Sequence, residues 1–396
     1  MLPKNVWVLA IVQPLVMSSA PVMIFVGGLL GTHLAPDPKM ATLPLAIMIV
    51  GTALFTIPAA MLMKLVGRKQ GSLLGLFSAF IGALLAAYAA YVASFLWLLI
   101  GSLLMGVSLA FMQQFRFAAL ESLANPDDAG KAISVLMLGG IVAAFLGPEV
   151  ALMAKDWVPS PHGFVGSFIG LAGLILLGML VFTAFKNPQF KDDEITGEAR
   201  PLSEIMRQPV FIVAVLAGVV GYGIMSFLMT ATPVSMHEMN GHSLQDTKFV
   251  IQSHIAAMFL PSLFTAVLFK YLGLNRLLLL GSLLYGVVVI FGLMGQHVLH
   301  FWWALVILGV GWNFLFVGGT ALLPSAYQPS ERFKVQAAND FIVFAIQAIA
   351  SLSAGWLVFA FGWNWLIIAC IPVTVLMFAI TLWYMRQNQK LAVATS

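Results

Sequence analysis

Hydrophobic runs alternate with short polar segments along the whole chain. Each run is long enough to cross the hydrocarbon core of a bilayer as one α-helix, which takes about 20 residues. We therefore expect twelve membrane-spanning helices, and an even number of crossings puts both termini on one side. The predicted spans are residues 6–31, 41–64, 71–91, 94–118, 131–154, 163–185, 209–234, 247–270, 277–296, 301–325, 335–361 and 364–385.

Composition indicates that lipid is the solvent of most of these side chains. The 396 residues are 61% hydrophobic and 9% charged, whereas soluble domains carry about 25% charged residues. Helices satisfy their own backbone hydrogen bonds in lipid, so we expect an all-α polytopic membrane protein. The first run is too long for a removable signal peptide and lacks a small-residue cleavage site. Cys370 is the single cysteine, which excludes an intramolecular disulfide.

The positions of the basic residues predict the orientation. With the N-terminus in the cytoplasm, the outer connections contain only Lys39, Lys155 and Lys248, and Arg116 lies within a span. The other lysines and arginines then lie in cytoplasmic segments, as the positive-inside rule requires. The net charge of +4 follows from this topology, so it does not indicate a nucleic-acid partner.

A polar linker near the middle of the chain separates six spans from six. Residues 186–209, KNPQFKDDEITGEARPLSEIMRQP, contain both charge signs, prolines and a glycine. This pattern predicts a cytoplasmic linker with a short interfacial helix within 201–207. We accordingly expect an N-terminal six-helix bundle at 1–186, a linker at 187–208 and a C-terminal six-helix bundle at 209–396.

The two halves contain similar connections at matching positions. KLVGRKQGSLLG (64–75) follows the second span and KYLGLNRLLLLG (270–281) follows the eighth. Polar connections also follow spans four and ten, at 121–132 and 329–336. Two six-span halves with matching connections are typical of internally duplicated transporters, in which an axis along the membrane normal relates the halves.

This arrangement resembles the major facilitator superfamily, whose loop after the second span reads Gly-x-x-x-Asp-Arg-x-Gly-Arg-Lys/Arg. The last three motif positions match at 67–69, whereas Ala60 replaces the first glycine and Lys64 and Leu65 replace the Asp-Arg pair. The family's aspartate latch between the halves therefore does not carry over to this chain.

The resemblance extends over essentially the whole chain. GGIVAAFLGPEVA (139–151) is similar to the Gly-Pro-containing fifth span of many antiporters, although Ala143 and Ala151 replace glycines. GWNFLFVGGTALLPSAY (311–327) is similar to a bacterial branch of the superfamily. The resemblance implies a monomeric protein of the bacterial cytoplasmic membrane. It also implies that the protein moves a small molecule by alternating access and needs no cofactor.

Polar side chains cluster at the inner end of the fourth span, in FMQQFRFAALES (111–122). Gln113 and Arg116 lie in its last two turns, and Gln13 lies at a similar depth in the first span. A buried arginine is costly unless it faces water or a partner, so these three residues are candidates for lining a substrate cavity. Alternatively, Arg116 extends to the lipid headgroups.

Three titratable residues within spans are candidates for proton coupling: Asp340, His254 and Glu149. Each has a structural alternative. Asp340 lies near the inner start of the eleventh span, where an ion pair between the halves would explain it equally well. His254 would be a hydrogen-bonded packing residue, and Glu149 a solvated helix end near Lys155.

Two further polar residues lie near the predicted bilayer midplane. Asn313 is beside Trp312 in span ten, and Tyr222 is between Gly221 and Gly223 in span seven. Both are substrate candidates, with helix packing at small residues as the alternative.

The resemblance also implies a pairing between two of these residues. In facilitator-like folds, the inner ends of spans four and five face those of ten and eleven when the cavity opens outward. We therefore predict that Arg116 and Asp340 approach each other and help to close an inner gate. Gln13 and Gln113 are expected to form hydrogen bonds nearby.

Other classes of membrane protein fit the sequence less well. The Gly-x-x-x-x-Gly-Lys-Ser/Thr nucleotide loop is missing, which disfavours direct ATP drive. HEMNGH (237–242) is one residue too long for the His-Glu-x-x-His zinc motif. No Ser-His-Asp set falls at one depth, so an intramembrane enzyme is disfavoured, and the short tails disfavour a sensor.

We expect a proton-coupled secondary transporter of a small organic solute. The Gly-Pro span points to efflux, with uptake or uniport as the alternative.

Overall fold

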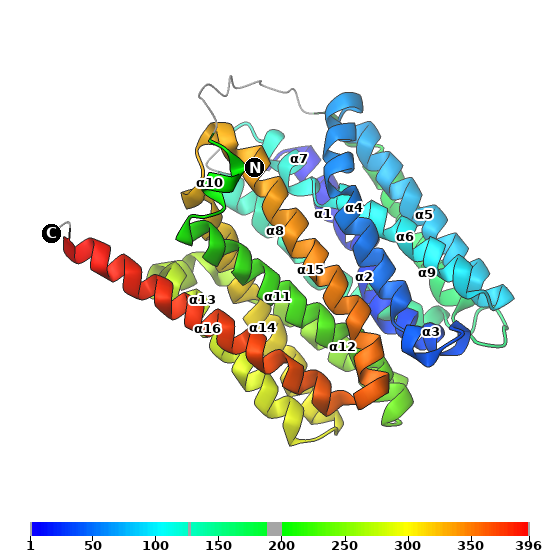
Figure 1. The fold of residues 1–396 in the computed structure, drawn as a ribbon. Helices are drawn as coiled ribbons and strands as arrows, with labels where there is room; N and C mark the ends of the chain where they lie inside the picture. Colours follow the sequence, from blue (N-terminus) through cyan, green and yellow to red (C-terminus); the bar gives the residue numbers. More distant parts are fainter. Residues whose placement is uncertain (1, 126–127, 188–199, 395–396) are drawn as a thin grey trace.

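The computed structural model describes residues 2–125, 128–187 and 200–394. Long helices run side by side through the molecule (Figure 1). Those before the linker are α1 Lys4–Met17, α2 Ser19–Val22, the π-helix η1 Met23–Gly27, α3 Gly28–Leu34, η2 Pro38–Met40, α4 Leu43–Val66, α5 Arg68–Val92, α6 Phe95–Met112, α7 Phe115–Glu121, α8 Ala129–Ala154 and α9 Val165–Phe182. Those after it are α10 Leu202–Ile205, α11 Pro209–Pro233, η4 Val234–Met239, α12 Leu244–Phe259, η5 Leu260–Phe264, α13 Thr265–Met294, α14 Val298–Leu322, η6 Leu323–Ala326, η7 Pro329–Glu331, α15 Arg332–Phe361 and α16 Trp363–Ala394.

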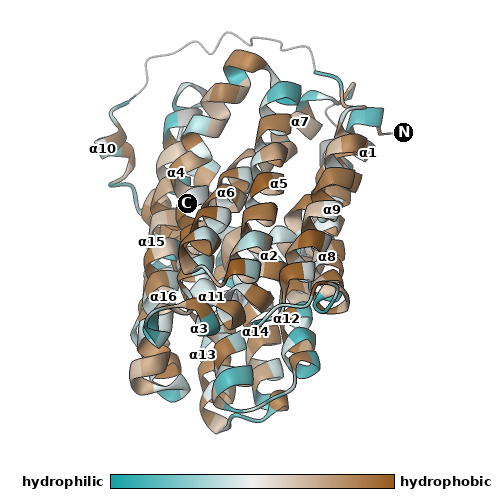
Figure 2. Ribbon diagram, turned by 90° about the vertical axis from the view of Figure 1, so that its right-hand side faces the viewer, coloured by the Kyte–Doolittle hydropathy of each residue, from teal (hydrophilic) through white to brown (hydrophobic). Residues whose placement is uncertain are grey.

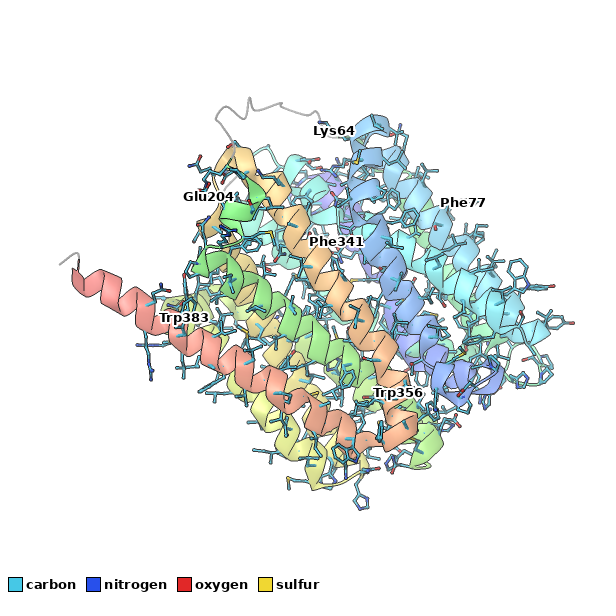
Figure 3. The ribbon with its side chains drawn as sticks, viewed as in Figure 1. Lys64, Phe77, Glu204, Phe341, Trp356 and Trp383 are labelled. Carbon is cyan, nitrogen blue, oxygen red and sulfur yellow. The ribbon has the colours of Figure 1, made fainter. Side chains whose placement is uncertain are left out.

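Hydrophobic side chains cover the outside of the helices. In Figure 2, hydrophobic colour dominates along the helices, and much of the hydrophilic colour lies at their ends and in the connections. Phe77, Phe341, Trp356 and Trp383, labelled in Figure 3, are each about half-exposed. An apolar surface of this extent is stable only in contact with lipid. The protein is therefore an integral membrane protein.

Eleven helices in the described ranges are long and apolar enough to cross a membrane. The eighth predicted run, 247–270, is not one continuous helix. It consists of α12, which has 16 residues, the 3-10 segment η5 and the first part of α13. Pro261 has no backbone N–H and interrupts the helix at η5. The sequence analysis was wrong about the continuity of this run.

The fourth predicted span, 94–118, corresponds to one stretch, Phe95–Glu121, that contains a tight turn. Helix α6 ends at Met112 and α7 begins at Phe115, with a turn at Gln113 and Gln114. The Gln114 backbone N–H donates to the Phe111 carbonyl at 3.0 Å, which closes the turn. Arg116 therefore lies on α7, after this turn and near the end of the predicted span.

The repeated connections adopt the same backbone conformation. Gly67 has φ 90° and Gly273 has φ 70°, a region that glycine enters without the strain of a Cβ atom. Each glycine ends the Lys-x-x-Gly sequence of its repeat, at Lys64 and Lys270. The sequence similarity therefore reflects a shared local structure and not only shared composition.

Close helix crossings also recur at equivalent places. A Cβ atom added at Gly106 of α6 would lie 2.0 Å from the Met48 carbonyl oxygen of α4. A Cβ atom at Gly309 of α14 would lie 2.6 Å from the His254 carbonyl oxygen of α12. These glycines allow spans four and ten to contact spans two and eight through their backbones, as small residues do in membrane helix packing.

Most of the extensive helix contacts join helices on the same side of the linker. Among α1–α9, α5 packs on α6 and α9, α4 on α6, and α1 on α8. Among α11–α16, α11 packs on α14 and α15, and α13 on α14 and α16. Contacts between these two sets are formed mainly by α4 with α15 and by α8 with α12. The predicted division into bundles at 1–186 and 209–396 is taken up below as a proposal.

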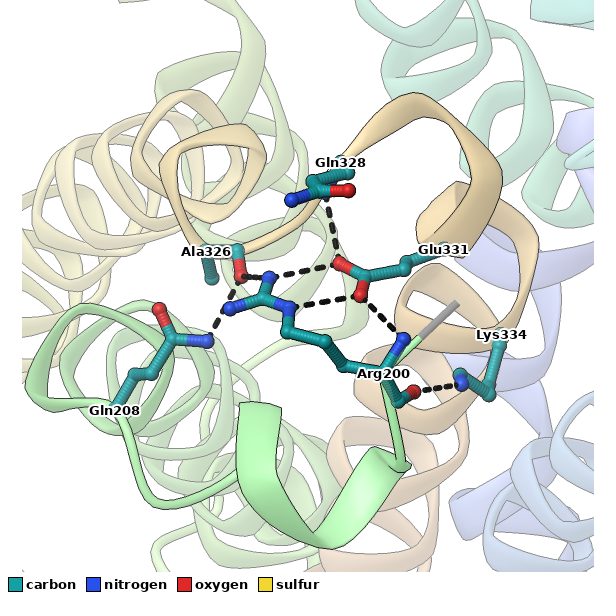
Figure 4. A network of polar contacts seen from close by, with 6 residues as sticks. All are labelled: Arg200, Gln208, Ala326, Gln328, Glu331 and Lys334. Atoms are coloured by element: carbon teal, nitrogen blue, oxygen red, sulfur yellow. Dashed lines mark hydrogen bonds and ion pairs between the residues drawn. The ribbon is translucent and has the colours of Figure 1, made fainter. Parts of the chain in front are cut away.

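The end of the linker is fixed by an ion-pair network (Figure 4). Helix α10 is the short helix predicted within 201–207, and residues 188–199 of the predicted linker lie outside the described residues. Arg200 Nε and Nη2 donate to the two carboxylate oxygens of Glu331 at 2.8 Å each. Glu331 is fully buried and also accepts from the Gln328 backbone N–H. The Lys334 ammonium donates to the Arg200 carbonyl.

This network predicts a pH-dependent loss of stability. Hydrogen bonds from the Arg200 side chain and the Gln328 backbone lower the pKa of Glu331 to about 2. A carboxylate with a lowered pKa stabilises the fold above its ordinary pKa, and that stabilisation is lost as the pH falls toward the folded-state value. We expect Glu331→Gln to lower the Tm in detergent at pH 7, and the Tm difference from wild type to shrink between about pH 4.5 and 2.

The matched control is Glu204→Gln, because Glu204 is an exposed carboxylate of α10 at the same end of the molecule (Figure 3). Glu204 acts on Arg200 through its charge, so this variant should change the Tm at pH 7 far less than Glu331→Gln does. Equal Tm values for Glu331→Gln and wild type at pH 7 would contradict the stabilising role of the network.

Candidate functional site

Arg116 and Asp340 approach each other from opposite sides of the linker. Arg116 Nη2 of α7 lies 3.9 Å from Asp340 Oδ2 of α15. The Arg116 guanidinium also lies 4.8 Å from the centre of the Phe117 ring, a distance typical of a cation–π contact. Arg116 therefore faces a charge partner in the protein, as the sequence analysis predicts. Whether the pair acts as a gate stays a prediction.

The charge pair keeps unused hydrogen-bonding capacity. A separation of 3.9 Å is too long for a hydrogen bond. Asp340 accepts a hydrogen bond from Asn339 Nδ2 at 3.0 Å, and the buried Arg116 Nε has no partner in the described part of the chain. The two side chains are 36% and 31% exposed, so both can be reached by a further molecule.

The predicted glutamine contacts to this pair are not present in the described residues. Gln13 donates to the Met17 sulfur at 3.8 Å, within its own helix, and its side chain packs on Gly139 of α8. Gln113 is half-buried in the turn between α6 and α7. Gln114, which the sequence analysis did not select, accepts from Arg68 Nη1 at 3.1 Å.

Tyr222 lies at the centre of an aromatic cluster formed by Tyr222, Phe259, Trp312, Phe316 and Phe344. The Tyr222 ring meets the rings of Trp312, Phe316 and Phe344 edge to face, with centroid distances of 5.1, 5.4 and 5.7 Å. Trp312 stacks on Phe316 at 4.9 Å and meets Phe259 at 6.1 Å. Helices α11, α12, α14 and α15 thus contribute to one set of flat apolar surfaces.

The aromatic cluster adjoins the charge pair. Phe344 follows Asp340 by four residues on α15, which places both side chains on one face of that helix. Both Arg116 and Asp340 also interact electrostatically with Tyr222. Within the cluster, Trp312 is buried and its indole N–H has no acceptor in the described residues. A buried donor without a partner is unusual, so this N–H keeps an unused hydrogen bond.

Several polar residues that hold this site in place were missed by the sequence analysis. Tyr285 of α13 donates to the carbonyl of Gly221, beside Tyr222, at 2.8 Å. Gln347 donates to Ser226 at 2.7 Å, and the Thr230 and Ser351 hydroxyls lie 2.8 Å apart. Residues 226 and 230 on α11 and 347 and 351 on α15 share a spacing of four. That spacing in two apolar spans is the signal that could have revealed these contacts.

Asn313 supports the interrupted helix on α12 and η5. Its side-chain amide donates to the Met258 carbonyl at 2.7 Å and to the Ser262 hydroxyl at 2.6 Å. Both partners flank the break at Pro261, where the regular helical hydrogen bonds are disturbed. Asn313 is buried, so the structure favours the packing alternative for this residue.

His254 is fully buried between α12 and α14. Its Nδ1 lies 2.6 Å from the Leu305 carbonyl oxygen, and because a carbonyl oxygen only accepts, Nδ1 carries a proton and donates it. Gly309 of α14 also lies close to the His254 carbonyl oxygen, so the backbones of α12 and α14 are in contact beside the histidine. These contacts are those of a packing residue.

Glu149 has a different partner from the one expected. Its carboxylate lies 2.6 Å from Lys248 Nζ of α12, whereas Lys155 lies over the Phe164 ring. Glu149 is half-exposed, but it joins α8 to α12 and is not a solvated end near Lys155. The sequence analysis overlooked Lys248 because the two residues meet only when α8 packs on α12.

Comparisons with known proteins identify the class of this membrane protein. The sequence profile described as Major Facilitator Superfamily matches residues 6–243 and 220–395. The fold is similar to a bacterial homologue of the human lysosomal transporter Spinster in an inward-facing, occupied conformation, with a TM-score of 0.73 and 14% identity over 96% of both chains. The chain belongs to the Major Facilitator Superfamily and is a transporter, not an enzyme.

Two individual relatives are similar to the chain over most of its length. The chain is 41% identical to the riboflavin transporter RfnT of Brucella anthropi over 369 residues, which is 92% of each chain. It is also 29% identical to the uncharacterised MFS-type transporter YddS of Bacillus subtilis, over 93% of this chain and 88% of that protein.

Proposed function

We propose that this transporter imports riboflavin or a closely related flavin. The observation that supports this most directly is the similarity to RfnT, since 41% identity extends over 92% of both chains. The sequence analysis predicted efflux from the partial Gly-Pro span and kept uptake as the alternative. The proposal takes the alternative, because the Gly-Pro span that pointed to efflux is degenerate at Ala143 and Ala151.

The aromatic cluster suits a flavin. The isoalloxazine ring system is flat, extended and largely apolar, so it can lie against the rings of Tyr222, Trp312 and Phe344. Each well-placed aromatic contact contributes about 0.5–1.5 kcal/mol beyond the burial of apolar area. Several rings that surround one ligand would therefore supply much of its binding free energy.

The proposal includes the architecture and orientation predicted from the sequence. Residues 1–186 and 209–396 form two six-helix bundles, and the substrate binds between them. Both termini lie in the cytoplasm of a bacterium, and the protein acts as a monomer in the inner membrane. The predominance of helix contacts within each side of the linker and the matching Gly67 and Gly273 conformations support this arrangement. A proton drives the cycle, and Asp340 is the residue that exchanges it.

Uptake of labelled riboflavin by a riboflavin-auxotrophic bacterium tests the proposal. We expect the chain to support growth on low riboflavin. We expect Trp312→Ala and Tyr222→Ala to lower uptake at least about tenfold, since about 1.4 kcal/mol of lost binding changes an equilibrium tenfold.

Trp356→Ala and Tyr271→Ala are the matched controls, because both residues are exposed on the apolar surface and lie outside the cluster. All variants are compared at equal amounts of protein in the membrane. Wild-type protein that is inserted but neither supports growth nor takes up riboflavin would overturn the proposed substrate. Normal uptake in both cluster variants would remove the cluster from the binding site.

A further inference from the structure

The charge pair and the aromatic cluster together suggest how a flavin would be oriented. We propose that Arg116 and Asp340 bind the pyrimidinedione edge of the flavin ring, and that substrate binding replaces their mutual contact. This inference rests on the proposed function. It adds the part of the substrate that is recognised and the residues that recognise it.

The first argument is the incomplete hydrogen bonding of the pair. Oppositely charged side chains that serve only to hold helices together usually form direct charge-assisted hydrogen bonds of about 2.7–2.9 Å. Glu149 and Lys248 do so at 2.6 Å, as do Arg200 and Glu331 at 2.8 Å. Arg116 and Asp340 stay 3.9 Å apart, and Arg116 Nε has no partner in the described chain. Of the three pairs compared here, this one retains donors and an acceptor at a distance that a ligand edge can bridge.

The second argument is chemical complementarity. The pyrimidinedione edge of an isoalloxazine presents a carbonyl, an N3–H and a second carbonyl in a row. A carboxylate only accepts hydrogen bonds and a guanidinium only donates them. Asp340 can therefore accept from N3–H while Arg116 donates to a flanking carbonyl. Neither residue alone matches both kinds of group.

The third argument is the position of the pair beside the rings. Asp340 and Phe344 share one face of α15, and the Phe344 ring lies 5.7 Å from that of Tyr222. A flavin whose polar edge faces the charge pair would direct its apolar dimethylbenzene end toward the aromatic cluster. The free indole N–H of Trp312 supplies one more donor there.

The charge of the site also predicts selectivity. Asp340 offsets the positive charge of Arg116, so the pair does not provide the net positive charge that a phosphate requires. Phosphorylated flavin should bind less well than riboflavin.

Occupancy by a flavin also weakens the contact between α7 and α15. The reason is that the Arg116 and Asp340 atoms that would bind the flavin are the same atoms that attract each other.

Binding measurements with purified transporter in detergent test this inference. Riboflavin fluorescence is titrated against the protein, and the titration is repeated with N3-methylriboflavin, which lacks the N3–H donor, and with flavin mononucleotide. We expect riboflavin to bind wild-type protein at least about tenfold more tightly than either analogue. In Asp340→Ala, riboflavin should bind more weakly, and the preference over the N3-methyl analogue should fall below threefold.

Two further variants complete the design. Arg116→Lys keeps the charge but not the forked donor geometry, and it should weaken riboflavin binding with the preference over the N3-methyl analogue retained. Glu204→Ala removes an exposed carboxylate elsewhere and should change neither affinity nor preference. Wild type and Asp340→Ala, each measured with riboflavin and with N3-methylriboflavin, form a thermodynamic cycle. This cycle isolates the interaction free energy between Asp340 and the N3–H group.

The outcomes separate this inference from the proposed function. If riboflavin neither binds nor is taken up, the proposed substrate itself is wrong. If riboflavin binds but wild-type protein binds N3-methylriboflavin equally well, recognition of the pyrimidinedione edge is overturned and riboflavin transport stands. A preference that persists unchanged in Asp340→Ala would also overturn it, because the N3–H contact would then lie elsewhere.

Discussion

Asp340→Asn is expected to abolish accumulation of substrate against a gradient while leaving exchange of internal for external substrate intact. In the proposed transport cycle, the Asp340 carboxylate takes up and releases a proton, whereas the asparagine amide cannot do so. The asparagine keeps an oxygen that accepts hydrogen bonds, so the substrate contact is largely retained. Protonation of Asp340 would also weaken its attraction to Arg116, which links the proton to the movement of α15.

The size of this effect follows from the driving force. With one proton carried per substrate, a gradient of one pH unit supplies about 1.4 kcal/mol, which supports about tenfold accumulation. In proteoliposomes with such a gradient, wild-type protein should approach this ratio and Asp340→Asn should equilibrate near onefold. His254→Gln and Glu149→Gln, measured alongside, test the other two coupling candidates. Accumulation of wild-type extent in Asp340→Asn would exclude Asp340 as the coupling residue.

Arg116→Ala should open the end of the molecule that carries α7. Both members of the pair are about a third exposed, so screening limits its contribution to roughly 1 kcal/mol. A change of that size shifts a two-state equilibrium several-fold. Cys370 is buried, and Cys370→Ala provides a background without cysteine. In this background, a probe at Gln113→Cys should react several-fold faster with a membrane-impermeant maleimide from the cytoplasmic side when Arg116 is alanine.

Reversal of the charges gives a more stringent test. The double variant Arg116→Asp, Asp340→Arg should restore part of the slow labelling rate, since exchanging the two charges keeps the pair attractive. Lys131→Ala is the matched control, because Lys131 pairs with Asp128 of the neighbouring connection and not across the linker. Equal labelling rates in Arg116→Ala and wild type would leave the pair without a gating role.

The fold was largely predictable because lipid imposes one dominant requirement. Runs of apolar residues long enough to span a bilayer must be helical, and the similar connections at 64–75 and 270–281 share a backbone conformation at Gly67 and Gly273. The break within span eight and the tight turn within span four were not predicted. Pro261 is a visible breaker, but hydropathy averaged over a run does not register one residue. The turn at Gln113 and Gln114 contains neither proline nor glycine and depends on packing.

The candidate site was predictable only where residues were chemically unusual for a membrane span. Arg116, Asp340 and Tyr222 are noticeable in apolar surroundings, and the family resemblance suggested which helices face each other. The rings around Tyr222 could not be predicted, because Trp312 and Phe344 lie far away in the sequence and aromatic residues are common in spans. Lys248 was overlooked as a partner of Glu149 for the same reason, since 99 residues separate them.

In the described part of the chain, two ion pairs join the helices before the linker to those after it: Arg116 with Asp340, where α7 meets α15, and Glu149 with Lys248, where α8 meets α12. Both pairs are in place together in this structure, at 3.9 and 2.6 Å, so in the proposed cycle the opening of either end separates one pair and keeps the other. Each open form then lacks one charge contact, which limits the free-energy difference between the two forms. A bias of about 1.4 kcal/mol from substrate or proton changes their ratio tenfold. A chain with a strong pair at only one end would rest in a single form and respond weakly to its cargo.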